Sequence, residues 1–363
     1  MAKTIQQVLG YVYLTSLVEE IKTGIPNMVP DEFYSTKDQC VADAVRHVRV
    51  AGTRQTARQS LYGAPPRRVA MKGLSEQDIK LLHFFEELPL PLREFLSLRD
   101  YDNYNVQQLG MQEVTRQALQ FKTRFDNGRI GAMTSVLANG KIWYDVDGNL
   151  LPSSSSAVLT IDFGIPANNL NQLNSIIGAS WATASTNIVT DIIEIKDVAL
   201  STTGYSLEGG YALHGKLISQ YFSLNTSMKE FLYRNPAYNQ KFIDTGEIPD
   251  GVMGLRWRRM SGSFYNDSTD TKQTFFGDDT ITFCPPVDRS WWTFMEGSYP
   301  VPTTYSQIMA SVEAAAASFD FKYGMFSYAY PIPAPPTACL VYGDTMLPWL
   351  KVPEAVFIAD VTP

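Results

Sequence analysis

Two short acidic motifs in the sequence have a spacing that could bind a metal ion. Gly277-Asp278-Asp279 places two carboxylates side by side, as in the Mg²⁺-binding hairpin of template-directed polymerases. No second carboxylate strand and no basic nucleotide channel accompany this motif, so a turn before a strand at 280–283 is the better interpretation. Asp145-Val146-Asp147-Gly148 is similar to the start of a calcium loop but lacks the downstream ligands, including the closing Glu. We therefore expect turns at both motifs and no bound metal.

Motifs for catalysis or cofactor binding are missing from the sequence. It contains no HExxH, no GxSxG nucleophile elbow, no P-loop and no GxGxxG. The cysteines form no CxxC pair, and we interpret them as small buried apolar residues in a reducing compartment. The histidines and cysteines are scattered singly along the chain: His47, His83, His214, Cys40, Cys284 and Cys339. The sequence predicts neither an enzyme nor a cofactor.

Charge is concentrated in a basic segment at residues 40–73, which has seven basic side chains against one acid, Asp43. The whole chain nevertheless has a net charge of −7. A cationic arm on an anionic body favours docking onto a complementary protein surface, here another copy of the chain. A nucleic-acid-binding protein that uses this segment on phosphates is the alternative, although such proteins are more often basic overall. A solvated loop without a specific partner is a third possibility. The arginines expected to make the contacts are Arg46, Arg49, Arg54, Arg58, Arg67 and Arg68.

The composition is typical of a protein whose surface contacts other protein chains. A length of 363 residues, 45% of them hydrophobic, allows a substantial core and predicts two domains. Charged residues make up 18%, below the roughly 25% of typical domains. Nineteen Tyr, nineteen Phe and six Trp are typical of interface cores, although a large aromatic-rich globular protein would also have them. We find no secretory signal and no apolar run long enough to span a membrane.

The clearest periodic element is a predicted helix at about 105–138. Its apolar residues recur every three or four positions, which places one stripe on a helix of about 50 Å. Gly128 and Gly131 weaken the helix locally and could bend it. Asn139-Gly140 is typical of a left-handed cap at its end. The stripe consists of Val114, Ala118, Phe121, Phe125, Ile130, Met133 and Leu137.

The remaining elements are predicted less sharply. Residues 41–50 and 69–71 are compatible with two strands joined by a basic tip, with a helix at 42–50 as the alternative. Residues 75–99 start like a capped helix that stops before Pro89. Beyond the long helix, the patterns predict strands at 141–144 and 158–161, a helix at 173–200, a strand at 210–213 leading into a helix at 216–233, short strands and turns over 235–310, a Pro-rich connector or edge strand at 328–337, and a last strand at 355–361.

The order of these elements, together with several short motifs, resembles a known family. The motifs are Leu137-Ala138-Asn139-Gly140-Lys141-Ile142, Ile161-Asp162-Phe163-Gly164, Trp181, Gly209-Gly210-Tyr211-Ala212-Leu213, Gly343-Asp344-Thr345-Met346-Leu347-Pro348 and Val352-Pro353-Glu354-Ala355-Val356-Phe357-Ile358-Ala359. The chain looks like the major capsid protein of tailed bacteriophages, in the family of the lambda major head protein, which has the HK97 fold. The resemblance covers roughly residues 30–363.

The resemblance implies an α+β fold with five parts. These are an N-terminal arm at 1–38, an extended E-loop hairpin at 39–75, a P-domain at 76–165 that includes the long spine helix, an A-domain at 166–325, and a C-terminal segment at 326–363 that returns to the P-domain. It also implies the function. Copies would assemble into hexamers and pentamers that form the icosahedral shell of a virion around double-stranded DNA.

The resemblance further implies partners, which we state as expectations. The chain begins at Met1 without a long helical prodomain, so a separate scaffolding protein is expected, together with a portal and possible decoration proteins. Packaged DNA would be contacted weakly and without sequence specificity, and assembly would take place in the host cytoplasm. The E-loop tip carries Arg where cross-linking needs Lys, so we expect no covalent cross-link between subunits.

Overall fold

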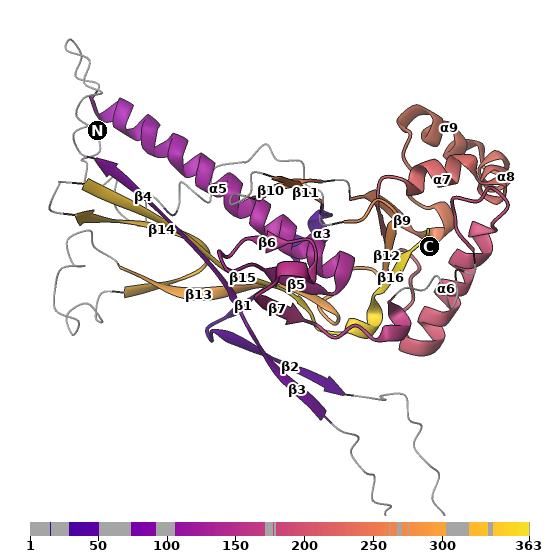
Figure 1. Ribbon diagram of the computed structural model, residues 1–363, viewed down its shortest axis with the longest axis horizontal. Coiled ribbons are helices and arrows are strands. Elements are labelled where there is room, and N and C mark those ends of the chain that lie inside the picture. The colour runs from indigo at the N-terminus through magenta and orange to yellow at the C-terminus, as the bar shows by residue number, and fades with distance from the viewer. Residues whose placement is uncertain are drawn as a thin grey trace, which may run out of the picture.

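The computed structural model describes residues 15, 29–50, 74–91, 106–170, 177, 179–260, 262–266, 271–274, 276–302, 319–332 and 337–362. A long helix lies along a sheet of long strands (Figure 1). A second sheet and a group of helices lie at the C-terminal end of that long helix. A two-stranded ribbon extends away from this body. The predicted α+β class is confirmed.

The long-stranded sheet has the order β1-β13-β14-β15-β4. β13, β14, β15 and β4 run antiparallel to their neighbours, whereas β1 is parallel to β13. Its strands are β1 (Lys37–Cys40), β13 (Trp292–Pro302), β14 (Phe319–Ile332), β15 (Thr337–Leu350) and β4 (Leu82–Pro91). The Pro-rich connector expected at 328–337 is thus largely strand, with 333–336 outside the described residues.

The helix predicted for residues 75–99 is wrong where the structure describes it. Residues Leu74–Lys80 form β3 and Leu82–Pro91 form β4. The physical reason is pairing over a long sequence distance, since ten residues of β4 are in register with β15, from Leu82 opposite Met346 to Pro91 opposite Thr337. Pro89 and Pro91 are tolerated because β4 is an edge strand.

The spine helix is α5 (Val106–Asn139), which confirms the helix predicted at about 105–138. It is one continuous helix through Gly128 and Gly131. In its first half an apolar stripe packs on Ala329, Leu340 and Tyr342 of the long-stranded sheet. From Arg129 to Ala138 every side chain is buried, so this half lies inside the protein. The cap is as predicted, because Gly140 has φ 67° and donates its N–H to the carbonyl of Val136 at 2.8 Å.

A small sheet with the order β6-β5-β7 follows α5. It consists of β6 (Leu150–Leu151), β5 (Lys141–Tyr144) and β7 (Leu159–Asp162), with short 3₁₀ helices η1 (Ser154–Ser156) and η2 (Ala167–Asn169) nearby. The two strands predicted at 141–144 and 158–161 are therefore confirmed. The Asp145 motif is a turn, because Oδ1 of Asp145 accepts the N–H groups of Asp147 at 2.9 Å and Asn149 at 2.7 Å.

The second sheet has the order β16-β12-β8-β9 and lies between two layers. Ala212, Phe283 and Phe357 pack into a core shared with the helices, while Tyr211 and Leu213 belong to the core that contains the end of α5. The sheet consists of β16 (Phe357–Asp360), β12 (Thr280–Cys284), β8 (Tyr211–His214) and β9 (Arg256–Arg259). Its helices are α6 (Ile188–Thr203), α7 (Ile218–Leu224), α8 (Thr226–Arg234) and α9 (Pro236–Thr245), and the region also contains η4 (Val252–Gly254), β10 (Phe264–Asn266), β11 (Thr271–Gln273) and η6 (Pro353–Ala355).

Three helix predictions in this region need correction. The helix expected at 173–200 begins only at Ile188, because the side chain of Asn187 accepts the N–H of Thr190 and caps it there. The helix expected at 216–233 is two helices, since Asn225 turns the chain and caps α8 through the N–H of Met228 at 3.2 Å. α9 lies where only strands and turns were expected, with Pro236 at its first turn.

The boundaries expected at 166–325 and 326–363 do not coincide with the two sheets, because each sheet takes strands from both segments. β13 falls within the segment 166–325 but lies in the long-stranded sheet, because it pairs with β1, β14 and β15. β16 falls within 326–363 but pairs with β12 in the second sheet, with Phe357 opposite Phe283. In the segment 326–363, β14 and β15 thus lie in the long-stranded sheet and β16 lies in the second sheet.

Candidate assembly interface

The basic segment begins in a ribbon of two antiparallel strands, β2 (Ala44–Val50) and β3 (Leu74–Lys80). The strand alternative for 44–50 is therefore right and the helix alternative is wrong, while the second strand expected at 69–71 lies outside the described residues. In the described part of the chain, β2 and β3 pair only with each other. The ribbon extends from the long-stranded sheet, as Figure 1 shows.

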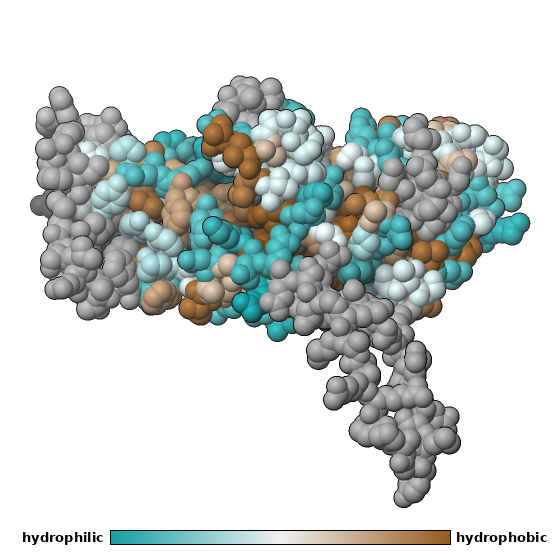
Figure 2. Space-filling view, turned by 60° about the horizontal axis from the view of Figure 1, so that its bottom comes forward, coloured by the Kyte–Doolittle hydropathy of each residue, from teal (hydrophilic) through white to brown (hydrophobic). Residues whose placement is uncertain are grey.

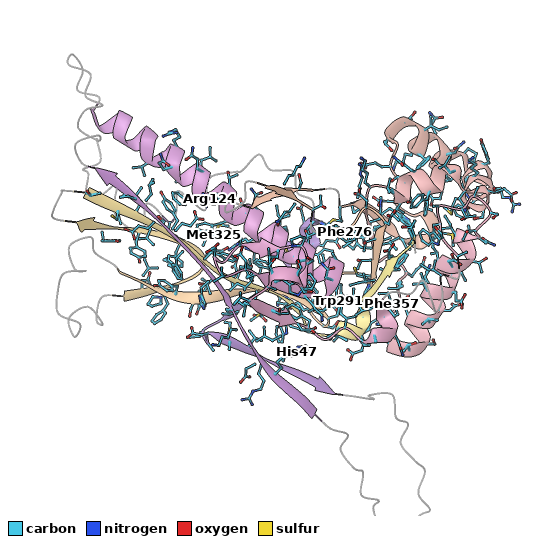
Figure 3. The ribbon with its side chains drawn as sticks, in the orientation of Figure 1. His47, Arg124, Phe276, Trp291, Met325 and Phe357 are labelled. Carbon is cyan, nitrogen blue, oxygen red and sulfur yellow. The ribbon has the colours of Figure 1, made fainter. Side chains whose placement is uncertain are left out.

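The base of the ribbon is firmly attached to the body. Val45, His47 and Ile79 are buried, and His47 lies beside the long-stranded sheet (Figure 3). The indole Nε1 of Trp349 donates to Nδ1 of His47 at 3.2 Å, and the two rings meet edge to face at 6.4 Å. The N–H of Leu81 donates to the carbonyl of Asp43 at 2.9 Å, which closes the ribbon at its root. These contacts fix the base of the ribbon on the body of the protein.

Of the six predicted contact arginines, the structure describes the side chain of Arg46 alone. Nε of Arg46 lies 3.6 Å from Oδ1 of Asp78 across the ribbon, and both side chains are about two thirds exposed, at 66% and 69%. An ion pair this exposed contributes about 0–1 kcal/mol, so it is readily exchanged for another partner. Arg49 lies in β2 opposite Ser75. Arg54, Arg58, Arg67 and Arg68 lie outside the described residues.

The predicted apolar stripe of α5 holds the helix to the sheet. All seven of its predicted members are buried: Val114, Ala118, Phe121, Phe125, Ile130, Met133 and Leu137. The ring of Phe121 stacks on Tyr342 of β15 with centroids 4.4 Å apart and an interplanar angle of 9°. At the other end of the helix, Oγ1 of Thr282 in β12 donates to the carbonyl of Leu137 at 2.9 Å. α5 thus connects both sheets as one strut.

The sequence does not predict the buried ion pair that joins α5 to β15. Nε and Nη2 of Arg129 each donate to one carboxylate oxygen of Asp344 in β15 at 2.6 Å. Arg129 is 8% exposed and Asp344 fully buried. Burial would lower the pKa of Arg129, but the carboxylates of Asp344 and Glu296 outweigh it and raise that pKa above its ordinary value. Nothing in the sequence pairs positions this far apart, although Asp344 stands in one of the motifs that carried the resemblance.

The glycine of that same motif is explained by close packing. A Cβ atom at Gly343 would lie within 2.8 Å of three atoms of the Phe326 ring. Because Phe326 is itself fully buried between neighbouring rings, it cannot move aside. In β15, Gly343 therefore makes room for the ring of Phe326, and Asp344 on the opposite face of the strand binds Arg129.

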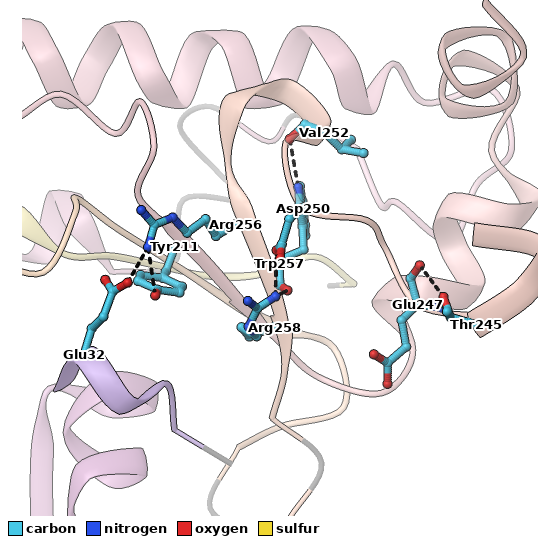
Figure 4. A network of polar contacts seen from close by, with 9 residues as sticks. All are labelled: Glu32, Tyr211, Thr245, Glu247, Asp250, Val252, Arg256, Trp257 and Arg258. Atoms are coloured by element: carbon cyan, nitrogen blue, oxygen red, sulfur yellow. Dashed lines mark hydrogen bonds and ion pairs between the residues drawn. The ribbon is translucent and has the colours of Figure 1, made fainter. Parts of the chain in front are cut away.

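The segment just before the ribbon joins the two sheets. In α3 (Asp31–Ser35), Phe33 is fully buried, with its ring 5.6 Å from Tyr211 of β8 and 5.3 Å from Trp292 of β13. Nε1 of Trp292 donates to the carbonyl of Phe33 at 3.0 Å. Nη1 of Arg256 donates to Glu32 at 2.5 Å and to the hydroxyl of Tyr211 at 3.2 Å (Figure 4). These contacts place the start of the ribbon against both sheets.

The residues that could do chemistry have structural partners. The carbonyl of Asp278 accepts the N–H of Leu217 at 3.0 Å, and Oδ1 of Asp279 accepts the hydroxyl of Tyr221 at 2.6 Å. Gly277-Asp278-Asp279 is therefore a turn that supports α7, as expected. Burial raises the pKa of the Cys284 thiol and lowers the pKa of His214 to about 4. The described residues hold no group of three or more His, Cys, Asp or Glu that could bind a metal ion.

Apolar side chains reach the surface in separate patches along the body (Figure 2). Among the described residues, the exposed large apolar side chains include Val41, Val146, Val158, Tyr233 and Ile243, each at least 66% exposed. Among the described residues, none of the helices is both long and apolar enough to cross a membrane.

A strut helix on a long sheet, a second sheet at its end and a projecting basic ribbon define a structural subunit. The family model described as phage major capsid protein E matches residues 11–300, and the chain therefore belongs to that family. The resemblance seen in the sequence is confirmed: the protein is a major capsid protein of a bacteriophage, a shell-forming component of the virion.

Two solved structures of similar fold come from phage-related proteins. A phage-related protein from Bordetella bronchiseptica RB50 is 8% identical, with 97% of each chain covered and a TM-score of 0.49. The mature capsid of bacteriophage PhiM1 contains a chain that is 11% identical, with 94% of this chain and 90% of that chain covered and a TM-score of 0.48. The sequence matches no curated protein.

Proposed function

We propose that copies of this chain assemble through hexamers and pentamers into an icosahedral shell around double-stranded DNA, and that the basic arm of each copy docks on an acidic face of a neighbour. The arm is the segment 44–73, which holds seven basic residues and no acid. The observation that supports its role is the β2–β3 ribbon, which leaves the body with a fixed root. A lone two-stranded ribbon is marginally stable in water, so contact with another subunit would stabilise it.

The chemistry of the arm suits reversible assembly. A shell subunit must hold several neighbours at once through contacts weak enough to let misplaced copies dissociate. Exposed ion pairs contribute about 0–1 kcal/mol each, so several arginines together give a bond that remains adjustable. Arginine is suited to the task because its planar group can donate two hydrogen bonds to one carboxylate.

The proposal includes partners and a place of assembly. A separate scaffolding protein would guide the copies, a portal would occupy one vertex, and decoration proteins could bind the finished shell. The role is structural and not enzymatic, and assembly takes place in the host cytoplasm. With a net charge of −7, the protein would contact packaged DNA weakly and without sequence specificity.

The test is a charge reversal in the arm. The variant Arg54→Glu/Arg58→Glu should remain folded by circular dichroism yet form no shells by electron microscopy. A matched control, Lys229→Glu/Lys241→Glu, makes the same change in net charge at exposed positions of α8 and α9 and should form normal shells. Normal shells from the arm variant would refute the role of the arm.

The same proteins test the nucleic-acid-binding alternative. If the arm binds phosphates, the isolated subunit should bind DNA with an affinity that falls steeply with salt, and the arm variant should lose that binding. We expect weak binding that the arm variant does not change.

A further inference from the structure

We propose that the outer edge of β14, the side of residues 325–332 that faces away from β15, is a strand-pairing surface that the chain covers with its own N-terminal segment. Thr15 is the anchor of this cover. Without the anchor, the outer edge pairs with the same edge of a second copy. The inference comes from the hydrogen bonds of Thr15 and from the sequence of β14. It goes beyond the proposed function, because it concerns the subunit before assembly.

From Gly324 onward, β14 has a neighbouring strand on one side only. Its residues before Gly324 pair with β13, and those from Gly324 to Ile332 pair with β15. The change of partner takes place at Gly324, whose φ of 71° lies in the left-handed region. Among the strands that the structure describes, none pairs with the outer edge. In Figure 1, this part of β14 reaches the end of the molecule opposite the second sheet.

Thr15 binds the outer edge at Ser327. Its hydroxyl donates to the carbonyl of Ser327 at 3.0 Å and accepts the N–H of the same residue at 3.2 Å. In an antiparallel ladder, a residue exchanges its N–H and its carbonyl with one residue of the next strand. One hydroxyl that binds both groups therefore takes the place of a strand residue. Thr15 is 4% exposed and Ser327 is fully buried, so water does not reach these bonds.

The contact also shows which backbone groups point outward. In an antiparallel pair, the N–H and carbonyl groups of successive residues alternate between the two sides of the strand. Because the groups of Ser327 point outward, those of Met325 and Ala329 point to the same side, and the residues between them bond to β15. Pro331 also lies on the outer side but has no N–H. The outer edge therefore has donors at Met325, Ser327 and Ala329 in a regular strand geometry.

The sequence of the outer edge favours pairing with another strand. Residues 325–332 read Met-Phe-Ser-Tyr-Ala-Tyr-Pro-Ile and carry no charge. Short uncharged segments of high β-propensity are typical sites of strand addition, and edge strands usually carry Lys, Pro or a cover against it. Pro331 protects one end of the edge, and Thr15 covers the centre. A second copy fits the uncovered edge, because two identical edges can pair antiparallel about Ser327 with two-fold symmetry.

The N-terminal segment has the length and composition of a cover. Val29, 14 residues after Thr15, is fully buried in the main core, and 14 residues of extended chain span up to about 50 Å. One copy can therefore supply both contacts. Val12, Leu14 and Leu17 flank Thr15 in the sequence and provide apolar side chains to shield an uncharged strand.

Hydrogen–deuterium exchange at single-residue resolution tests the anchor in the unassembled full-length subunit. Thr15→Val keeps the shape of the side chain but removes both hydrogen bonds, so the amide of Ser327 should exchange about tenfold faster or more. Thr15→Ser keeps the hydroxyl and should exchange like the wild type. Thr134→Val removes another buried hydroxyl, which donates to the carbonyl of Ile130 at 2.7 Å, and should leave the exchange of Ser327 unchanged.

Thioflavin T fluorescence and electron microscopy test the pairing with a second copy. Thr15→Val should form thioflavin-positive aggregates that are not shells, whereas Thr15→Ser and Thr134→Val should not. Adding Tyr330→Lys to Thr15→Val places a positive charge on the edge strand and should lower the thioflavin signal to that of the wild type. Lysine is suited to this position because the hydroxyl of Tyr330 already donates to the carboxylate of Glu87, at 2.5 Å.

Each outcome decides the inference. Unchanged exchange of Ser327 in Thr15→Val would overturn the role of Thr15 as anchor. Faster exchange without aggregates, or aggregates that Tyr330→Lys leaves as abundant, would overturn the pairing of the outer edge with a second copy. If the protection of Ser327 in the wild type falls on dilution, another copy supplies Thr15, and the cover within one chain is wrong. Protection that is independent of concentration supports the inference.

Discussion

Arg129 illustrates how a single residue can connect distant parts of a chain. Its guanidinium group makes two hydrogen bonds to Asp344, lies 3.5 Å from Glu296 and stands 5.3 Å from the centre of the Phe294 ring. These partners belong to β13 and β15, so one side chain of α5 holds two strands of the sheet. A buried pair of this kind contributes modest net stability, but it is costly to break on one side only.

Removing only one member of this pair should therefore be severe. Arg129→Ala leaves the Asp344 carboxylate buried without its partner and should lower the free energy of unfolding by about 3–5 kcal/mol. Chemical denaturation of the unassembled subunit measures this change. Replacing both members, Arg129→Met with Asp344→Leu, should recover most of the loss, because neither charge of the pair remains and Glu296 keeps its ion pair with Lys37.

An exposed pair provides the control for that measurement. Arg234 and Glu230 in α8 lie 4.0 Å apart with most of both side chains exposed. Arg234→Ala should change the free energy of unfolding by less than about 0.5 kcal/mol. A loss in Arg129→Ala no larger than this would show that the buried pair does not hold α5 to the sheet.

His214 should make the stability depend on pH below neutrality. It is 1% exposed, and burial lowers its pKa from 6.5 to about 4. Between these values the unfolded chain binds a proton that the folded chain does not, so the free energy of unfolding falls as pH falls. The slope from this residue reaches about 1.4 kcal/mol per pH unit at most. Denaturation of the subunit at several pH values should show a shallower slope for His214→Gln, and equal slopes would contradict the prediction.

At the scale of elements, local sequence patterns were sufficient where an element depends on its own residues. The spine helix, its glycine cap and the hairpin after it follow from apolar spacing and turn chemistry within about 60 residues. β4 could not be found in this way. Its residues alternate, with Phe84 and Leu88 toward α5 and Phe85 on the opposite face, but this pattern only makes sense beside β15, about 250 residues later. Local capping signals at Ser75 and Asp78 favoured a helix, and tertiary pairing overrode them.

The same contrast applies to the candidate site. The basic arm is visible in the sequence because it is a local concentration of charge. The Arg129–Asp344 pair and the contacts of Phe33 with Tyr211 and Trp292 connect distant segments, so no local pattern reveals them.

The two faces of α5 should respond differently to truncation. Phe125 is 4% exposed in the core with Leu340 and Tyr342, so Phe125→Ala should cost about 3–5 kcal/mol of unfolding free energy. Leu119 lies on the same helix but is 41% exposed, and Leu119→Ala should cost less than about 1 kcal/mol. Thermal or chemical denaturation of both variants checks the difference. Similar losses would mean that the stripe is not what attaches α5 to the sheet.

At the scale of the whole molecule, the body and the charged arm have different roles in assembly: the body sets the shape of the subunit, and the arm makes charged contacts with neighbours. α5 connects the two sheets through its apolar stripe and the hydrogen bond from Thr282 to the carbonyl of Leu137. The ribbon is attached at its root by His47 and Trp349. Each copy can therefore present a fixed shape to its neighbours, while the strength of the contact depends on exposed charges.

This division predicts that assembly weakens with salt. Ionic interactions at the surface are screened over about 10 Å at 0.1 M salt and about 3 Å at 1 M, whereas apolar contacts are not weakened by screening. If arginines of the arm hold neighbouring copies together, the protein concentration needed for shell formation should rise as sodium chloride is increased from about 0.05 M to 0.5 M. Light scattering over a concentration series measures this threshold.

An arm without charge isolates the cause of the salt effect. In a variant with Arg54→Gln, Arg58→Gln, Arg67→Gln and Arg68→Gln, the threshold concentration should be higher at low salt and nearly independent of salt, because the screened interaction has been removed. The exposed-lysine control, Lys229→Gln/Lys241→Gln, should keep the salt dependence of the wild type. Equal salt dependence in the wild type and the neutral-arm variant would locate the charged contacts elsewhere on the subunit, because an arm that docks by charge cannot lose its charges without losing its response to salt.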